Sequence, residues 1–271
     1  MPELPEVETV RRSLLPLEGQ RLKEIHVEDG RLRYRVTTKL TQKVAGERLR
    51  VIERIGKYLL LRFPSDFLLF HLGMTGRMLI GQKEKSPYLK LRLQFERDQL
   101  DFIDVRRFGF VLSGAAAAKA LPKGEDAYRG FDKKIVAQRI RVSRAPVKSI
   151  LLDQKILAGL GNIYVSEILF LAKVHPATRG IDLGDDAVAY IFKAIPKVLQ
   201  KAIESKGSSI SDFVYALPGE KEYSTGNYQK KFLVYSRDGE PCKVCGATIQ
   251  KMVQSARSSF FCPECQPSRL A

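Results

Sequence analysis

The chain has 271 residues, 44% hydrophobic and 28% charged, which is enough for two domains with packed cores. Its 46 lysines and arginines outnumber its 30 aspartates and glutamates, and the resulting formal charge of +16 favours a polyanionic partner such as nucleic acid. No stretch approaches the roughly 18 apolar residues of a membrane span, and the acidic start MPELPEVETV does not resemble a signal peptide, so we expect a cytoplasmic protein without a membrane partner.

The first predicted element is a helix that follows Pro5. Val7, Val10 and Leu14 recur at steps of three and four residues, which is the period of one helix face. Proline is typical of a first helical turn, and Gly19 is suited to the end of the helix.

The N-terminus itself carries residues that suit covalent catalysis. A proline directly after Met1 permits removal of the methionine, which exposes a secondary amine on Pro2. Such an amine has a low pKa and can attack an electrophilic carbon to form an iminium. Glu3 and Glu6 follow at once and are available for proton transfer. The alternative is that they only complement the helix dipole, as acidic residues in a first turn often do.

Short β-rich runs fill the chain from about residue 20 to residue 113. Turn sequences such as FPSD and ERDQ separate them. Many short strands at this spacing predict an antiparallel sandwich or barrel. The runs are IHVED, LRVIERI, YLLLRF, FLLFHL, RMLIG, YLKLRLQF, LDFID and FGFVLS.

A helical period replaces the β pattern from about residue 132. The segment before it has the character of a linker, although its alanine run is also compatible with a short helix. A polar, glycine-containing stretch at residues 215–229 is predicted to be a mobile loop. The helical segments are KKIVAQRIRV, VKSILLDQKIL, YVSEILFLAKV and DAVAYIFKAIPKVLQKAIES.

All four cysteines lie near the C-terminus as two CxxC pairs, Cys242 with Cys245 and Cys262 with Cys265. Two such pairs, 16 residues apart, allow four thiolates to enclose one Zn²⁺ tetrahedrally, with no position left for substrate water. We therefore expect one structural zinc per chain, with a β-hairpin between the pairs. Arg257 in this hairpin is either a phosphate contact or a solvated surface charge.

Seven motifs follow one another along the chain: MPELPEVETVRR, GKYLLLRF, HLGMTGR, DVRRFGF, LLDQKILAGLGNIYVSE, KGSSISDF and CKVCG…RSSFFCPEC. In this order they resemble the formamidopyrimidine-DNA glycosylase family, also called MutM, over essentially the whole chain. The opening is more similar to this branch than to the related endonuclease VIII branch, which usually starts PEGPE.

The resemblance implies an α+β multidomain fold with DNA held in the cleft between the domains. Residues 1–113 would form an N-terminal antiparallel β-sandwich that carries the first helix, and residues 114–131 a linker. Residues 132–231 would form a helix-two-turn-helix domain whose lesion loop spans about 215–229, and residues 232–271 a zinc finger with a β-hairpin.

The activity implied by the resemblance is base-excision repair of damaged double-stranded DNA by a monomer. A bifunctional enzyme, a DNA glycosylase and abasic-site lyase, would remove 8-oxoguanine and formamidopyrimidines and cleave the abasic site by β,δ-elimination through a Schiff base. Two alternatives stay open: endonuclease VIII-like excision of oxidised pyrimidines, and a non-catalytic protein that binds damaged DNA. The protein would be cytoplasmic, bacterial in type and associated with the nucleoid through its DNA.

The resemblance also assigns catalytic roles. Pro2 matches the nucleophile that attacks C1′, Glu3 the proton donor for opening of the sugar ring, and Glu6 a carboxylate near the lesion. Lys57 matches a lysine of phosphate binding and β-elimination. Arg257 matches the hairpin arginine that grips the kinked backbone and takes part in δ-elimination.

Further positions match DNA contacts. His71 and Asn162 correspond to residues that hold phosphate, and Arg144 and Lys148 to basic positions that face the DNA. The glycines beside Asn162 would allow its turn to approach an anion closely.

Three side chains match those that enter the duplex where the lesion leaves it: Met74, Arg106 and Phe108. An extruded base leaves a gap in the stack, which an apolar wedge and an arginine can fill. By periodicity alone, an ordinary core is the favoured interpretation of Met74 and Phe108.

The chain departs from the usual family pattern at four places, none of them a proposed catalytic group. Ser86 and Tyr88 stand where a histidine pair is common, and residues 123–129 replace an LGPEPL-like linker. Lys206 and Ser236 stand where glycine is usual. These departures bear on one backbone contact and on lesion preference.

Overall fold

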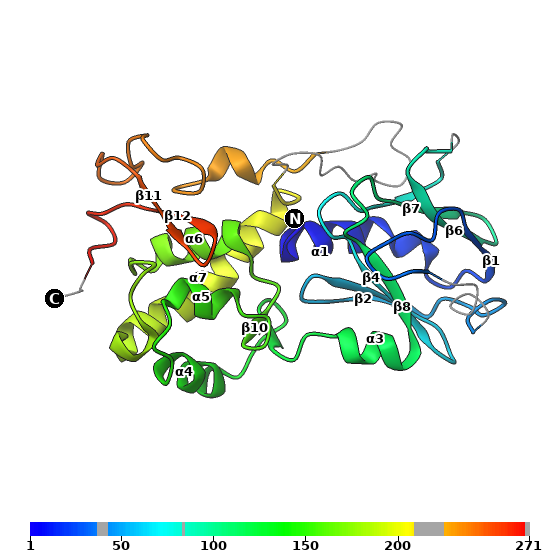
Figure 1. The fold of residues 1–271 in the computed structure, drawn as a ribbon, viewed down its shortest axis with the longest axis horizontal. Helices are drawn as coiled ribbons and strands as arrows, with labels where there is room; N and C mark the ends of the chain where they lie inside the picture. The colour runs from blue at the N-terminus through cyan, green and yellow to red at the C-terminus, as the bar shows by residue number, and fades with distance from the viewer. Residues whose placement is uncertain (37–42, 83–84, 209–224, 269–271) are drawn as a thin grey trace. The chain divides into compact units, whose positions relative to one another are not determined.

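The computed structural model describes residues 1–36, 43–82, 85–208 and 225–268 (Figure 1). The chain divides into two compact units, and each is considered by itself. The first comprises Met1–Leu121 and the described residues of Ser205–Asn227, and the second comprises Pro122–Glu204 with the described residues from Tyr228 onwards. Of the predicted lesion loop, residues 215–224 lie outside the described part of the chain.

The predicted N-terminal helix is confirmed as α1, Leu4–Ser13, but it ends before Gly19. Pro16 has no N–H group with which to continue the helical hydrogen-bond pattern. The chain instead tightens into a short 3₁₀ turn, Leu15–Leu17. Within the first unit, α1 packs against β2 and β3 (Figure 1).

Two four-stranded antiparallel sheets confirm the predicted sandwich. A single apolar core of leucines, valines and phenylalanines from both sheets and from α1 supports the packing, because alternate residues of each strand point inwards. One sheet has the order β1 (Leu22–Val27), β6 (Leu89–Phe95), β7 (Gln99–Ile103) and β5 (Arg77–Ile80). The other has the order β2 (Val51–Ile55), β3 (Tyr58–Arg62), β4 (Phe67–His71) and β8 (Phe110–Ser113).

Helices dominate the second unit, in the order that the sequence predicts. They are α4 (Lys133–Arg141), α5 (Val147–Leu152), α6 (Asn162–Leu171) and α7 (Asp185–Glu204), with short 3₁₀ turns at Gly180–Asp182 and Tyr228–Lys231. The alanine run of the predicted linker forms α3, Gly114–Ala120, in the first unit. Two short strands, β9 (Glu125–Asp126) and β10 (Leu157–Ala158), pair in parallel. No helix in the described residues is both long and apolar enough to cross a bilayer.

Helix α5 is shorter than the predicted segment VKSILLDQKIL because polar side chains close a turn after Leu152. The Asp153 carboxylate accepts a hydrogen bond from the backbone N–H of Lys155 at 2.8 Å. The amide of Gln154 donates to the carbonyls of Leu152 and Leu160, both at 2.9 Å, and its oxygen accepts from the N–H of Gly159. These side chains compete with the helical pattern and shape the turn that leads into α6.

The predicted C-terminal hairpin is confirmed as β11 (Gln250–Gln254) and β12 (Arg257–Phe261). Ser255 and Ala256 form its two-residue turn with φ of +48° and +59°, as the twist of a tight hairpin requires. The segment before the first cysteine pair is fixed on α6 by Glu167. Its buried carboxylate accepts hydrogen bonds from three consecutive backbone N–H groups, beginning at Leu233.

Candidate functional site

The start of the chain lies within a cluster of charged side chains of the first unit. Burial lowers the pKa of the N-terminal amine, with Glu3 and Glu6 acting to raise it and Lys57 and Arg106 to lower it further. All four side chains therefore surround the residue that precedes Pro2. The tertiary structure thus brings four predicted residues together at the position of the predicted nucleophile.

Glu6 is held on both of its oxygens. One accepts the backbone N–H of Glu3 at 2.9 Å, and the other accepts the N–H and hydroxyl of Ser208 at 2.6 and 3.1 Å. Gly207 has a φ of +78°, and a Cβ there would lie 2.7 Å from the Glu6 carboxylate. A side chain at residue 207 would therefore displace Glu6. Sequence analysis missed Ser208, although the KGSSISDF motif contains it.

Lys57 lies at the β2–β3 turn and is buried beside a charged anchor that sequence analysis also missed. The fully buried guanidinium of Arg54 donates to the Glu8 carboxylate of α1 at 3.1 Å and to the carbonyl of Gly56 at 3.0 Å. Burial alone would raise the pKa of Glu8, but hydrogen bonds from Arg11 and its neighbours hold it below its usual value. Helix α1 and the turn of Lys57 are thus joined by a buried ion pair. An arginine within the apolar strand VIERI was the available signal.

His71, at the end of β4, is a neutral imidazole in a defined tautomer. Burial lowers its pKa to about 4, and the cations Lys57 and Arg33 contribute to the shift. Its Nδ1 accepts the N–H of Gly73 at 3.1 Å, and its ring stacks on Phe110 with 5.1 Å between centroids. The proton therefore resides on Nε2, which makes His71 a neutral hydrogen-bond donor.

Arg33 is an exposed cation near His71 that sequence analysis did not single out. Its backbone N–H donates to the carbonyl of Gly109 at 3.1 Å, and its guanidinium lies 5.9 Å from the ring centre of Tyr34. The neighbouring Arg31 is paired with Asp29 at 2.8 Å, whereas Arg33 forms no ion pair with any residue that the structure describes. The available signal was the alternation of arginines with apolar and aromatic residues in GRLRYRV.

Met74, Arg106 and Phe108 are solvent-facing residues of the first unit. The exposed fractions of Met74 and Phe108 are 40% and 47%, which excludes the alternative that they belong to the core. The guanidinium of Arg106 lies 4.9 Å from the ring centre of Phe108, within the range of a cation–π contact. The three side chains thus form an exposed patch in which Met74 and Phe108 are apolar and Arg106 carries a positive charge.

The remaining predicted DNA contacts lie in the second unit. Arg257 is exposed at the first position of β12, and Arg144 is exposed before α5. Asn162, the first residue of α6, donates its amide to the carbonyl of Ser258 at 3.0 Å. Its side-chain oxygen is buried without a hydrogen-bond partner among the described residues.

Lys148 is placed differently from the expectation of a basic side chain that faces DNA. It is 1% exposed, and its ammonium donates to the Ser258 carbonyl at 2.6 Å and to the Ser259 hydroxyl at 2.7 Å. The ammonium of Lys148 therefore makes these hydrogen bonds within the protein, at the two residues that follow Arg257. Both Lys148 and Asn162 brace the hairpin at the same carbonyl.

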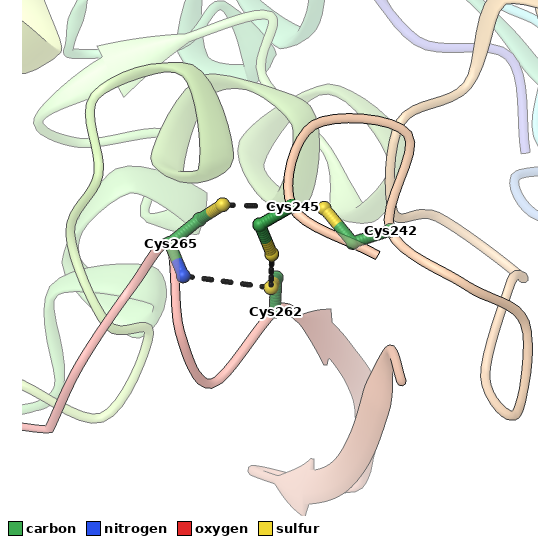
Figure 2. Close-up of side chains that lie close together, drawn as sticks. All are labelled: Cys242, Cys245, Cys262 and Cys265. Carbon is green, nitrogen blue, oxygen red and sulfur yellow. Dashed lines mark hydrogen bonds between the residues drawn. The ribbon is translucent and has the colours of Figure 1, made fainter. Parts of the chain in front are cut away.

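The four cysteines converge in space, as Figure 2 shows. Their sulfurs all lie within 4.8 Å of one another, and a tetrahedral Zn²⁺ with bonds of about 2.3 Å would set them about 3.8 Å apart. Burial raises the pKa of Cys262 and of Cys265, so four thiolates at this distance require a cation. The N–H groups of Val244 and Cys265 each point to a sulfur at 3.4 Å, as in a stabilised thiolate site. The donor set fits a closed structural zinc site.

Comparison with known proteins covers the whole chain. Three family profiles match: "Formamidopyrimidine-DNA glycosylase N-terminal domain" at residues 1–111, "Formamidopyrimidine-DNA glycosylase H2TH domain" at 124–214, and "Zinc finger found in FPG and IleRS" at 239–267. The formamidopyrimidine-DNA glycosylase of Gluconobacter oxydans is 39% identical over 98% of this chain and 100% of its own length. That of Chloroflexus aurantiacus is 38% identical over 98% of both.

Solved structures agree with the sequence relatives. A complex of Lactococcus lactis Fpg with DNA that contains an abasic site has a TM-score of 0.86 and 35% identity. A complex of the wild-type Lactococcus lactis protein with DNA that contains N7-benzyl-Fapy-dG has a TM-score of 0.87 and 36% identity, and one with DNA that contains an oxidised pyrimidine has 0.86 and 34%. Each alignment covers 98% of this chain and 100% of the solved chain.

Proposed function

The chain belongs to the formamidopyrimidine-DNA glycosylase family and is a DNA-repair glycosylase, and on this basis we propose that it excises oxidised purines and then cleaves the abasic site. The observation that carries the proposal is the N-terminal cluster, where Glu3, Glu6 and Lys57 surround the residue that precedes Pro2. A neutral amine next to carboxylic acids is the arrangement that Schiff-base chemistry needs.

In the proposed reaction, the Pro2 nitrogen, freed by removal of Met1, forms a bond to C1′ of the damaged nucleotide. The glycosidic bond breaks, and its electron pair leaves with the base, which takes up a proton. Glu3 donates a proton to O4′ as the C1′–O4′ bond opens, which leaves an iminium on the proline. Glu6, fixed by Ser208, keeps a negative charge close to this cation.

Strand cleavage follows from the acidity that the iminium gives to the hydrogens on C2′. Loss of a C2′ proton expels the 3′ phosphate, and a second elimination expels the 5′ phosphate. We assign Lys57 to phosphate binding and the first elimination, and Arg257 to the backbone grip and the second. Because Arg54 ties the turn of Lys57 to α1, the lysine and the nucleophile keep a fixed separation.

We propose that contacts with the DNA backbone phosphates are made by His71, Asn162, Arg144 and Arg257. We add Arg33 to this set because it is a cation without an ion-pair partner among the described residues and lies near His71. Lys148 stays a predicted DNA-facing position, but its contacts favour an indirect role in which it supports the hairpin of Arg257. Met74, Arg106 and Phe108 would fill the gap left by the flipped base.

The proposal also includes the domain boundaries predicted above and one structural zinc. It further includes a monomeric state and a cytoplasmic, nucleoid-associated site of action.

Oxidised pyrimidines are a second candidate substrate class. A relative from Lactococcus lactis has been solved with DNA that contains an oxidised pyrimidine, so the fold is compatible with both classes. Rates on duplexes with 8-oxoguanine opposite cytosine and with thymine glycol decide between them. The non-catalytic alternative is disfavoured because the matching family and its relatives are DNA glycosylases.

Borohydride trapping on an 8-oxoguanine duplex tests the mechanism. We expect a covalent adduct that maps to the peptide beginning at Pro2. Pro2→Gly should slow base removal markedly, since its primary amine is a weaker substitute. Glu3→Gln should block base excision but leave part of the cleavage at a preformed abasic site, which needs no departing base.

The matched control is protein that retains Met1, in which the proline nitrogen is an amide without a nucleophilic lone pair. We expect this form to give neither adduct nor cleavage. If it traps as fast as processed protein, another amine such as Lys57 is the nucleophile and the assignment to Pro2 is wrong.

A further inference from the structure

The three intruding side chains come from two loops that the topology places side by side. Met74 lies between β4 and β5, and Arg106 and Phe108 lie between β7 and β8. Both loops cross from one sheet of the sandwich to the other, and β4 pairs with β8 while β5 pairs with β7. Segments far apart in sequence are therefore neighbours at one edge of the sandwich.

A buried carboxylate and one hydroxyl join the two loops. Asp104 is fully buried, and one of its oxygens accepts the Thr75 hydroxyl proton at 2.6 Å. Its other oxygen accepts the N–H of Gly109 at 2.8 Å, which closes the second loop on itself. The Thr75 oxygen in turn accepts the backbone N–H of Arg106 at 3.0 Å. Thr75 follows Met74 directly, so each polar contact lies next to an intruding residue.

The backbones of the loops also touch. Gly73 has a φ of +63°, and a Cβ there would lie 2.4 Å from the nitrogen of Gly109 and 2.5 Å from the carbonyl carbon of Phe108. No side chain fits at this position, so the two loops approach as closely as backbones can. Arg107 is held with a φ of +60°, and its guanidinium lies 3.5 Å from the Asp29 carboxylate.

The two loops therefore combine an ordered backbone with exposed side chains. The polar groups that fix the backbone are buried, whereas Met74, Arg106 and Phe108 stand in solvent. Side chains on a backbone that is already ordered lose less conformational entropy on binding than side chains on a mobile loop. They also enter a duplex in one arrangement, because neither loop can move without breaking a charged hydrogen bond.

We propose that Thr75 and Asp104 are positioning residues that lock the two loops into one preset wedge, so that Met74, Arg106 and Phe108 enter the duplex together. This inference rests on the proposed function, since it concerns the step in which the base leaves the stack. Neither residue touches the reacting atoms. They act through the three side chains that they place.

Thr75→Val is the decisive variant, because it keeps the shape of the side chain and removes the hydroxyl. Thr75→Ser is the matched control, because it keeps the hydroxyl. The zinc-loaded protein is mixed with a duplex that carries 8-oxoguanine next to 2-aminopurine, whose fluorescence reports unstacking. We expect Thr75→Val to slow the fluorescence change and base excision by about tenfold or more, as loss of a buried charged hydrogen bond implies. Thr75→Ser should restore both to within about threefold.

A double-mutant cycle separates positioning from general damage to the fold. In a Met74→Ala, Arg106→Ala, Phe108→Ala background the wedge is absent, so Thr75→Val should have no further effect on base excision. If the effect of Thr75→Val is as large in this background as in the parent, or if Thr75→Val and Thr75→Ser behave alike, the inference is wrong. If the parent protein shows no excision and no trapping on the lesion duplex, the proposed function itself fails, and the inference fails with it.

Discussion

His71 illustrates how a single residue gains its chemistry from its surroundings. The sequence offers a histidine at a position expected to bind phosphate, and an imidazolium would be the natural assumption. Burial and the nearby cations instead keep the ring neutral, with its proton on the nitrogen that Gly73 leaves free. A neutral donor is consistent with a phosphate contact that does not change across physiological pH.

The first prediction concerns this protonation state. The pKa of His71 falls from 6.5 to about 4 on folding, so between these values the unfolded chain binds more protons than the folded protein. The free energy of unfolding should therefore decrease by roughly 2–4 kcal/mol as the pH drops from about 6.5 to about 4. Above that window His71 should contribute no pH dependence to the free energy of unfolding. Urea unfolding at several pH values in this range measures how the free energy of unfolding changes with pH, and His71→Gln should make this change smaller. A His71 imidazole resonance that titrates near 6.5 in NMR spectra would contradict the prediction.

Two departures from the family pattern are visible at the same scale. Lys206 and Ser236 stand where glycine is usual, and both have a left-handed backbone, with φ of +59° and +56°. The family's glycines are explained by this requirement, because residues with a Cβ are strained there. This chain keeps the conformation with other side chains, so the neighbouring packing holds these turns in place.

At the scale of elements, we expect the hairpin beside the four cysteines to depend on metal ligation rather than on its own packing. Its core around the cysteines consists of a few residues, among them Phe260 and Ile249. Small modules of this kind generally gain their folding free energy from a bound metal. The braces from Lys148 and Asn162 reach the hairpin only if it is folded.

The second prediction follows from that dependence. Elemental analysis should find one zinc per chain, and Cys262→Ser should remove it, unfold the hairpin, displace Arg257 and abolish DNA binding. The sandwich of the first unit should keep its β-sheet circular dichroism, since all four cysteines belong to the second unit. Ser149→Ala is the control, because it removes only a hydroxyl that meets Ser255 at 3.3 Å in the hairpin turn. Undiminished DNA affinity in Cys262→Ser would show that the hairpin carries no DNA contact.

Charge acts at the scale of the whole molecule. The formal charge of +16 is distributed unevenly, and some cations already have an acidic partner: Arg31, Lys90 and Arg107 all meet Asp29. Net charge therefore does not say which cations are available to phosphate. Which cations remain available is decided by the fold.

The third prediction uses this distinction. Binding to undamaged duplex should weaken steeply with salt, with a log–log slope of about −4 to −7 for roughly five to eight phosphate contacts. Arg33→Ala should make the slope shallower by about 1, whereas Arg31→Ala, whose guanidinium is already held by Asp29 at 2.8 Å, should change it less. A slope shallower than about −2 would refute a basic DNA-binding surface. Equal effects of the two substitutions would refute the role of Arg33.

The sequence by itself determined the order of elements, the sandwich, the hairpin, the metal ligands and the family. These follow from local periodicity, from CxxC spacing and from ordered motifs such as MPELPEVETVRR. Only the tertiary structure decided that Lys148 is buried and that His71 is neutral. It also decided that Ser208, Arg54 and Asp104 support residues predicted to be functional or the segments that carry them. Each of these depends on groups distant in sequence whose charges and hydrogen bonds meet only after folding, and no local pattern encodes such a meeting.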